Sequence, residues 1–264
     1  CGRALWRRSN QRQMPLYTAD ALVLRTYKLG EADRIVVFLT ADRGKRRGVA
    51  NGARRPKSKF AGGLEPLTRG RIAYFEREQR DLVRLQYVEP TCSPLKRPTE
   101  EALAYVSYFA ELIDESTLEA DPADALFRLG VSVLEATTVG VPVDRLARYF
   151  EYWLLRLQGV YPTTTTCSSC GAMLTNGAQM VPATGTLECM RCKSSEHGIG
   201  LSAEALGFLQ RAKTITPGQL GDVVLSTQGV RQLASLHRLL IRTHLDKELK
   251  SVRVLRELTD SRVP

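Results

Sequence analysis

The sequence lacks the signatures on which most enzymes and membrane proteins depend. No stretch approaches the twenty consecutive apolar residues needed to span a bilayer, and no charged, then apolar, then small-residue leader is present. There is no glycine-rich phosphate loop ending in Lys-Ser or Lys-Thr, no His-Glu-x-x-His helix, no Gly-x-Ser-x-Gly motif and no acidic cluster suited to two magnesium ions. We therefore expect a soluble cytoplasmic protein that is not an enzyme.

Histidine is also scarce, with three copies in 264 residues. His237 and His244 are seven positions apart in a segment of helical period, so they could share one face of a helix. A histidine pair without carboxylates is usually a surface feature, and this is our prediction for both. His197 lies just past the last cysteine and is a possible substitute metal ligand, although a surface position is the commoner case.

Acidic residues are absent from residues 43–59, where eight cations occupy seventeen positions. Glycine and proline are interspersed among them, and glycine lets a backbone approach a partner closely. A block of like charges repels itself unless a polyanion neutralises it. The alternative to a phosphate-binding loop is a solvated, flexible loop, and we favour the phosphate-binding interpretation.

The positive charge is concentrated at one end of the chain. The net charge is +10, yet residues 14–90 carry 16 cations against 9 acids, whereas residues 95–160 carry 6 cations against 11 acids. A basic first module beside an acidic second one suggests a polyanion-binding face on the first and a protein-binding or structural face on the second.

Four of the six cysteines have the spacing of metal ligands. Cys167 and Cys170 form one Cys-x-x-Cys pair, and Cys189 and Cys192 form another, with eighteen residues between the pairs. This spacing is typical of one tetrahedral zinc site, with disulfides or a redox pair as the alternatives. Four thiolates would fill the coordination sphere and leave no position to activate water, so we predict one structural Zn²⁺ ion.

Short strands dominate the first ninety residues. The apolar pattern predicts strands at residues 19–27, 34–39, 48–50, 69–74 and 82–88, with residues 29–33 joining the first two as a hairpin. Five short strands without a long helix are typical of a small barrel of the oligonucleotide-binding (OB) type.

The period then changes to that of helices, at residues 100–118, 124–138 and 143–158, with prolines at the breaks between them. The helical period returns from Leu201, where Ser202 has the pattern of an N-cap. We expect this last segment to pack back on the earlier helices. The sequence thus predicts an α+β protein with a five-stranded OB-fold barrel at residues 14–92, one all-helical domain made of residues 93–160 and 199–264, and an inserted four-cysteine zinc ribbon at residues 161–198. Residues 1–13 are basic and unpatterned, and we interpret them as a translated extension or an expression remnant outside the fold.

Several strings in the chain resemble the RecO family of bacterial recombination mediators. They are Gly-Glu-Ala-Asp-Arg-Ile-Val at residues 30–36, Arg-Gly-Lys at 43–45, Gly-Ala-Arg-Arg-Pro-Lys-Ser-Lys-Phe at 52–60 and Leu-Glu-Pro-Leu at 64–67. Residues 150–155, with Gly159, Pro162, Cys167, Cys170 and Gly171, resemble the approach to the zinc module in the same family. The extension before Met14 departs from the family pattern.

The resemblance implies a protein that binds single-stranded and double-stranded DNA and anneals complementary strands. It also implies a partnership with RecR and with the single-stranded DNA-binding protein, so that RecA can be loaded at gaps. No nucleotide hydrolysis and no membrane partner are implied, and a protein of this kind is expected in the cytoplasm at the nucleoid.

We expect the barrel and its basic loop to hold phosphates without reading bases. The candidate DNA-binding residues are Arg25, Arg34, Lys45, Arg46, Arg47, Arg54, Arg55, Lys57 and Lys59. Residues 45–47 are expected to form a rigid groove wall and residues 54–59 a mobile flap. Candidates for base stacking are Tyr17, Tyr27, Phe38, Phe60 and Tyr74, although Phe38 also suits a core position.

Two other classes of function stay open at this stage. The chain could be a protein-interaction scaffold whose helical domain binds the acidic tail of a partner, which would need local cations such as Arg128, Arg145 or Arg148 beside an apolar groove. A zinc-dependent nuclease or regulator would instead show cleavage or sequence preference.

Overall fold

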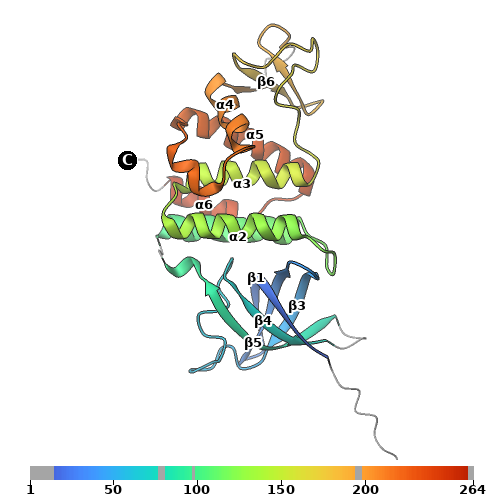
Figure 1. The fold of residues 1–264 in the computed structure, drawn as a ribbon, viewed down its shortest axis with the longest axis vertical. Coiled ribbons are helices and arrows are strands. Elements are labelled where there is room, and N and C mark those ends of the chain that lie inside the picture. The colour runs from blue at the N-terminus through green and yellow to red at the C-terminus, as the bar shows by residue number, and fades with distance from the viewer. Residues whose placement is uncertain (1–14, 77–80, 97–98, 194–197, 261–264) are drawn as a thin grey trace, which may run out of the picture.

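The computed structural model describes residues 15–76, 81–96, 99–193 and 198–260. The molecule is elongated, with a β-barrel at one end, helices in the middle and the cysteine-rich module at the other end (Figure 1). Across these ranges no helix is both long and apolar enough to cross a membrane. The predicted extension at residues 1–13 and the possible ligand His197 lie outside the described residues.

Five strands close the barrel in the order β1-β2-β3-β5-β4. Their bounds are β1 Leu16–Leu29, β2 Asp33–Thr40, β3 Gly44–Ala50, β4 Arg69–Phe75 and β5 Leu82–Cys92. The β3–β5 pairing is parallel and the others are antiparallel. The predicted OB-fold barrel is confirmed. Strand β3 is longer than predicted, so three of the clustered cations lie within it.

Strand alternation gives the barrel two apolar faces. On β2, Val36 and Phe38 point into the barrel core, whereas Val37 and Leu39 join the core of the helical domain. Leu22 and Leu24 of β1 also belong to the core of the helical domain. Successive side chains of a strand point to opposite faces. The outer face of β1 and β2 is therefore buried beneath helices and belongs to the core of the helical domain, whereas the barrel interior is a separate apolar cluster.

The helices follow the predicted order, with ends set by local capping. Their bounds are α1 Glu100–Glu115, α2 Asp124–Val139, α3 Val143–Leu157, α4 Ala203–Ala212, α5 Thr227–Leu245 and α6 Lys250–Asp260, with short 3-10 turns at η1 Pro94–Lys96 and η2 Pro217–Asp222. The hydroxyl of Ser202 accepts a hydrogen bond from the backbone N–H of Ala205, which confirms the predicted N-cap. Gly140 ends α2 in the left-handed conformation that glycine adopts without strain.

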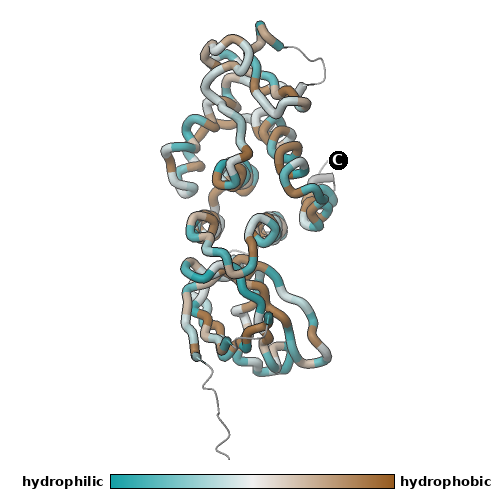
Figure 2. The backbone as a smooth tube through the Cα atoms, turned by 90° about the vertical axis from the view of Figure 1, so that its right-hand side faces the viewer, coloured by the Kyte–Doolittle hydropathy of each residue, from teal (hydrophilic) through white to brown (hydrophobic). Residues whose placement is uncertain are grey.

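The late helices pack against the early ones, as predicted. Helix α5 packs on α3, and helix α6 packs on α1. The buried faces of these four helices contribute to one apolar core. Figure 2 shows apolar segments where the helices face one another and along the barrel strands. Helix α2 lies directly over the barrel (Figure 1), where a methyl group at Gly130 would come within 2.7 Å of Leu22 Cδ1.

The cysteine-rich module is inserted between α3 and α4. It contains strands β6 Ala178–Val181, β7 Thr186–Cys189 and β8 Ile199–Leu201, in the sheet order β7-β6-β8. Strand β6 is central and buried along its whole length. Cys189 ends β7 and the other three cysteines lie outside the strands, in a module at the end of the molecule farthest from the barrel (Figure 1).

Candidate nucleic-acid surface and metal centre

The basic loop between β3 and β4 is a series of turns attached to the barrel. The backbone N–H of Gly52 donates to the carboxylate of Asp33 at 2.7 Å, and the backbone N–H of Arg54 donates to the carbonyl of Ala32 at 2.9 Å. Further along, the Phe60 ring is 2% exposed and fills part of the barrel core. The predicted flap is therefore attached at both ends, and its mobility stays a prediction.

Four cations stand exposed on this loop, which we call the loop cations: Arg54, Arg55, Lys57 and Lys59. The Arg54 guanidinium donates to the carbonyl of Gly30 at 3.0 Å, and the Lys59 ammonium lies 5.3 Å from the centroid of the Phe60 ring. Within the described part of the chain, no carboxylate lies within 4.0 Å of any of the four. They are therefore available to an external anion. Arg34 on β2 is half-buried and donates to the Thr26 hydroxyl at 3.0 Å.

Three other predicted DNA-binding residues lie against the helical domain, and we call them the interface cations: Arg25, Lys45 and Arg47. The Lys45 ammonium is buried and binds Asp114 Oδ1 at 3.0 Å. Arg25 Nε lies 3.3 Å from Asp114 Oδ2, and its terminal nitrogen lies 3.5 Å from Glu115. Arg47 forms an ion pair with Glu119. The acidic residues of α1 and of the segment after it therefore neutralise this part of the basic run.

The backbone seals the same interface. The N–H of Ala120 donates to the carbonyl of Lys45 at 3.0 Å, and Gly44 has a φ of +66°. A methyl group at Gly44 would come within 2.0 Å of the carbonyl oxygen of Asp121. The connection between α1 and α2 covers Lys45, which therefore cannot belong to an open groove wall. The Arg47 side chain is about half exposed, and its place in a groove wall stays a prediction.

Arg46 points to a different place from its two neighbours, at one end of the barrel. Its guanidinium and that of Arg43 each lie 3.9 Å from Glu76. The Arg43 guanidinium also stacks 3.9 Å from the centroid of the Tyr17 ring. Arg46 is half-buried, and the negative charge of Glu76 weakens the local attraction for an anion.

Most of the predicted base-stacking residues are unavailable for stacking. Phe38, Phe60 and Tyr74 are at most 2% exposed and form the barrel core. Tyr17 already packs against Arg43 and Tyr74. Tyr27, which is 45% exposed, is the one predicted stacking residue with a ring open to solvent. Alternation in the strands buries Phe38 and Tyr74, whereas Phe60 is buried because the loop packs it into the barrel core.

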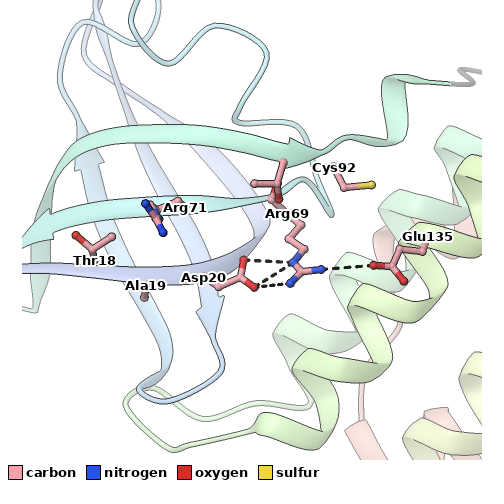
Figure 3. A pocket seen from close by; sticks show the side chains of 8 residues that line it. Thr18, Ala19, Asp20, Arg69, Arg71, Cys92 and Glu135 are labelled. Carbon is pink, nitrogen blue, oxygen red and sulfur yellow. Dashed lines mark hydrogen bonds and ion pairs between the residues drawn. The ribbon is translucent and has the colours of Figure 1, made fainter.

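A hollow of about 580 Å³ lies where the barrel meets α2 (Figure 3). Arg69 spans it, with its guanidinium 2.7 Å from Asp20 of β1 and 3.4 Å from Glu135 of α2. The hydrogen bonds to Asp20 raise the pKa of Arg69 above its ordinary value. Asp20, Arg69 and Glu135 thus pair with one another and form a second link between the barrel and the helices. Arg71 also lines the hollow but is exposed, and it has no ion pair among the described residues.

The four predicted cysteines come together in the inserted module. The sulfur atoms of Cys167, Cys170, Cys189 and Cys192 all lie within 4.8 Å of one another. The sulfurs of Cys170 and Cys189 are 3.8 Å apart, which matches the edge of about 3.8 Å expected for a tetrahedron with metal–sulfur bonds of about 2.3 Å. The cluster could therefore hold a metal ion.

The surroundings of these thiols favour a bound cation. The pKa of Cys167 is lowered to about 6, because the backbone N–H groups of Cys189 and Cys170 donate to its sulfur. The pKa of Cys192 is raised to about 12, because its thiol shares hydrogen bonds with Cys170 and Cys189. Four adjacent thiolates repel one another, so all four can ionise together only when a cation binds them.

Comparison with known proteins now adds to this geometry. Residues 14–94 match the family described as "Recombination protein O N terminal", and residues 97–253 match "Recombination protein O C terminal". The chain belongs to the RecO family. It is 34% identical over 251 residues to the DNA repair protein RecO of Koribacter versatilis, across 92% of this chain and 99% of that protein. It is also 34% identical over 244 residues to DNA repair protein RecO of Geobacter sulfurreducens, across 91% and 97%. RecO-family membership places the chain among proteins of DNA repair and recombination.

Sequence reasoning missed a buried polar network in the helical domain of this RecO-family chain. His237 is fully buried, so the predicted surface position is wrong. Its Nδ1 lies 2.8 Å from Glu151 of α3, and its Nε2 lies 2.8 Å from the hydroxyl of Tyr161. Glu151 also accepts hydrogen bonds from Tyr108 at 2.7 Å and from Arg148 at 2.9 Å. The signal in the sequence was an acid, Glu151, within the apolar stripe of a helix.

Opposing effects set the pKa values in this network. Burial alone would raise the pKa of Glu151, but the charge of Arg148 and the hydrogen bond from His237 lower it below its ordinary value. Burial lowers the pKa of His237. Glu151 and His237 are buried among α1, α3 and α5, and their hydrogen bonds join these helices.

Proposed function

We propose that this chain is a DNA-binding recombination mediator that holds the phosphate backbone on its loop cations. The observation that carries the proposal is a group of four exposed cations, without carboxylate partners in the described structure, on a loop that is fixed to an OB-fold barrel. Phosphate contacts give affinity without sequence information. Such a surface would bind both single-stranded and double-stranded DNA.

Strand annealing follows from the same chemistry. Cations that neutralise phosphates reduce the repulsion between two strands and leave the base edges free to pair. The proposal includes the partners implied by the RecO resemblance: RecR, the single-stranded DNA-binding protein and, indirectly, RecA. The family membership supports these partners, and the geometry adds an open basic surface on which DNA could be exchanged. No reaction is assigned to the chain.

The interface cations have a different role in this proposal. Arg25 and Lys45 fix the barrel to α1, and Arg47 fixes it to the connection that follows α1. These three cations act on DNA through the orientation of the barrel. Direct DNA binding is assigned to Arg34 and the loop cations, with a smaller share for Arg46 because Glu76 is nearby.

We also propose that the four cysteines bind one structural Zn²⁺ ion. The donor set of four thiolates and the tetrahedral spacing support this choice. Removal of the metal with a chelator should lower the melting temperature, and mass spectrometry of the native protein should show one zinc per chain. Unchanged melting after verified metal removal would contradict a structural role.

The principal test is DNA affinity across a salt series. If four loop cations meet phosphates of single-stranded DNA, the logarithm of the association constant should fall with the logarithm of salt at a slope of about −3. Reversing Arg54, Arg55 and Lys57 to glutamate should make this slope shallower by about 2 and weaken all sequences alike. A matched control reverses three exposed cations of α5, namely Arg231, Arg238 and Arg242. Equal losses in both triple variants would show that only total charge matters and would contradict the proposed surface.

The scaffold hypothesis requires cations on the helical domain that are free to bind an acidic tail, but the three candidate cations already have partners within the protein. Arg148 is buried against Glu151, Arg128 pairs with Asp124 at 3.0 Å, and Arg145 donates to the carbonyl of Val223 at 2.9 Å. Titration of an acidic peptide in the absence of DNA separates the two functions, because a scaffold would bind the peptide at least as well as it binds DNA.

A further inference from the structure

A second basic site lies at the junction between the helical domain and the inserted module. A pocket of about 300 Å³ opens between the end of α3, the end of α4 and the segment that leads into the cysteine cluster. We call it the junction pocket, and it is lined by Arg156, Lys213, Tyr152, Tyr161 and the threonines at positions 163–165. Helices α3 and α4, whose ends line the pocket, lie on the opposite side of α2 from the barrel (Figure 1).

Two cations in this pocket are held in place by neutral groups. Arg156 donates to the hydroxyl of Tyr152 at 2.8 Å, and its guanidinium lies 5.3 Å from the centroid of the Trp153 ring. The Lys213 ammonium donates to Gln210 Oε1 at 2.8 Å, and the Gln210 amide donates in turn to the carbonyl of Thr164 at 3.2 Å. None of the lining residues is acidic, and across the described residues no carboxylate lies within 4.0 Å of either cation.

The two cations repel each other. Burial lowers the pKa of Lys213 below its ordinary value, and the nearby charge of Arg156 lowers it further. Both cations sit at the last turns of helices, where the helix dipole contributes partial negative charge. That partial charge favours cations there but does not neutralise two full positive charges, so an anion entering the pocket would relieve the repulsion.

The other groups of the pocket select the type of anion. Three consecutive threonines, at positions 163–165, contribute to the lining, and a threonine hydroxyl can donate to an anion. Arginine offers a planar set of N–H donors and lysine a compact charge, a combination suited to the several oxygen atoms of a phosphate group. The volume admits a phosphate with part of an attached sugar.

We propose that the junction pocket binds a phosphodiester group of a nucleic-acid strand, as a second contact point separated from the loop cations by the helical domain. The choice of nucleic acid as the source of the phosphate rests on the proposed function. With two contact points, one molecule would hold two strands, or two segments of one strand, on opposite sides of its helices. This arrangement would raise the local concentration of one strand near the other during annealing.

Tryptophan fluorescence gives a direct test of the pocket. The chain has two tryptophans, so substitution of Trp6→Phe leaves Trp153, beside Arg156, as the single reporter. Titration with inorganic phosphate, and separately with a short oligothymidylate, should give saturable changes in Trp153 fluorescence. Both changes should be lost in the Arg156→Gln/Lys213→Gln variant. Because Arg156 packs on an aromatic ring, Lys213→Gln alone serves as the variant least able to disturb folding, and it should weaken both responses.

A salt series with single-stranded DNA then tests the role of the pocket. Reversal of Arg156 and Lys213 to glutamate should make the salt slope shallower by about 1.4, the value for two phosphate contacts, and should slow annealing. The control reverses Arg211 and Arg238, two exposed cations outside the pocket. The inference is overturned if the pocket variant behaves like this control, or if an acidic peptide saturates the Trp153 response while phosphate and oligothymidylate do not. If the pocket variant weakens DNA binding but reversal of the loop cations does not, the result contradicts the proposed DNA surface on the barrel and supports the proposed site in the junction pocket.

Discussion

The interface cations and the loop cations come from one basic run but meet opposite environments. Lys45 is buried against Asp114, whereas Arg54 and Arg55, fewer than a dozen positions later, are exposed and face no carboxylate in the described structure. Within β3 itself, alternation sends Lys45 and Arg47 toward the helical domain and Arg46 toward the end of the barrel. A cluster of charge in the sequence is therefore not one surface, and its function has to be assigned cation by cation.

Two glycines offer the largest expected difference between these regions. Gly44 and Gly52 have left-handed φ values of +66° and +71°, but their surroundings differ. Gly52→Ala meets nothing closer than the Arg55 side chain at 3.6 Å, so it should cost only about 1 kcal/mol of strain. Gly44→Ala would clash with the backbone of Asp121, so the free energy of unfolding should fall by at least about 3 kcal/mol.

Chemical denaturation of both alanine variants measures this difference. If the two losses are equal, β3 does not closely approach the connection between α1 and α2. The interface cations would then not be covered by that connection, and there would be no structural reason to assign them a role different from that of the loop cations.

Substitution of Lys45 should have the next largest effect. Lys45→Ala leaves the carboxylate of Asp114 in a partly buried site, where Arg25 is its remaining partner. Breaking a buried ion pair costs about 3 kcal/mol or more, so we expect a loss of about 3 kcal/mol in the free energy of unfolding. Arg54→Ala is the matched control and should change stability by less than about 0.5 kcal/mol. A stable Lys45→Ala variant with weakened DNA binding would instead place Lys45 on the DNA surface.

The sequence predicted those features whose partners are close along the chain. The five strands followed from alternation, the N-cap at Ser202 from a short pattern, and the cysteine cluster from two Cys-x-x-Cys pairs. The fate of individual charges did not follow, because Lys45 meets an acid 69 positions away and His237 meets one 86 positions away. A single sequence does not show which distant acid each of these side chains will meet in the fold. Burial of Phe60 within a basic loop was likewise decided by packing, since the apolar ring fills the barrel core.

The buried network of His237 and Glu151 is a third kind of charged site. Its contribution to the free energy of unfolding should depend on pH near neutrality, whereas the charges of the loop cations and interface cations should not. Arginine and lysine ordinarily titrate far above pH 7. The pKa of buried His237 is lowered, so the unfolded chain binds a proton more readily than the folded chain. The stability due to neutral His237 should therefore be complete above its unfolded pKa of about 6.5 and should be lost as the pH falls below that value, by up to about 1.4 kcal/mol per pH unit. The lowered pKa of Glu151 adds a further loss below about pH 4.5.

Denaturation midpoints between pH 5 and pH 7.5 would measure this dependence. In His237→Gln, which keeps a polar side chain of similar reach, the part of the slope between pH 5 and pH 6.5 should disappear. Persistence of the full slope in that variant would mean that another group is responsible. At pH 7.5 the His237→Gln variant should show the same salt dependence of DNA binding as the unsubstituted protein, because the buried network is remote from the loop cations.

The smallest expected effect is also the most direct comparison of the two groups. Arg55→Gln removes one exposed loop cation and should make the salt slope of single-stranded DNA binding shallower by about 0.7, with little change in stability. Arg47→Gln removes an interface cation of the same residue type. Its pair with Glu119 is about half exposed, with side-chain exposures of 52% and 45%, so it should lower the free energy of unfolding by less than about 1 kcal/mol and leave the slope unchanged. An equal change of slope in both variants would mean that DNA displaces Glu119 from Arg47. The outer face of β3 would then belong to the DNA surface, and the division between loop and interface cations would hold only in the absence of DNA.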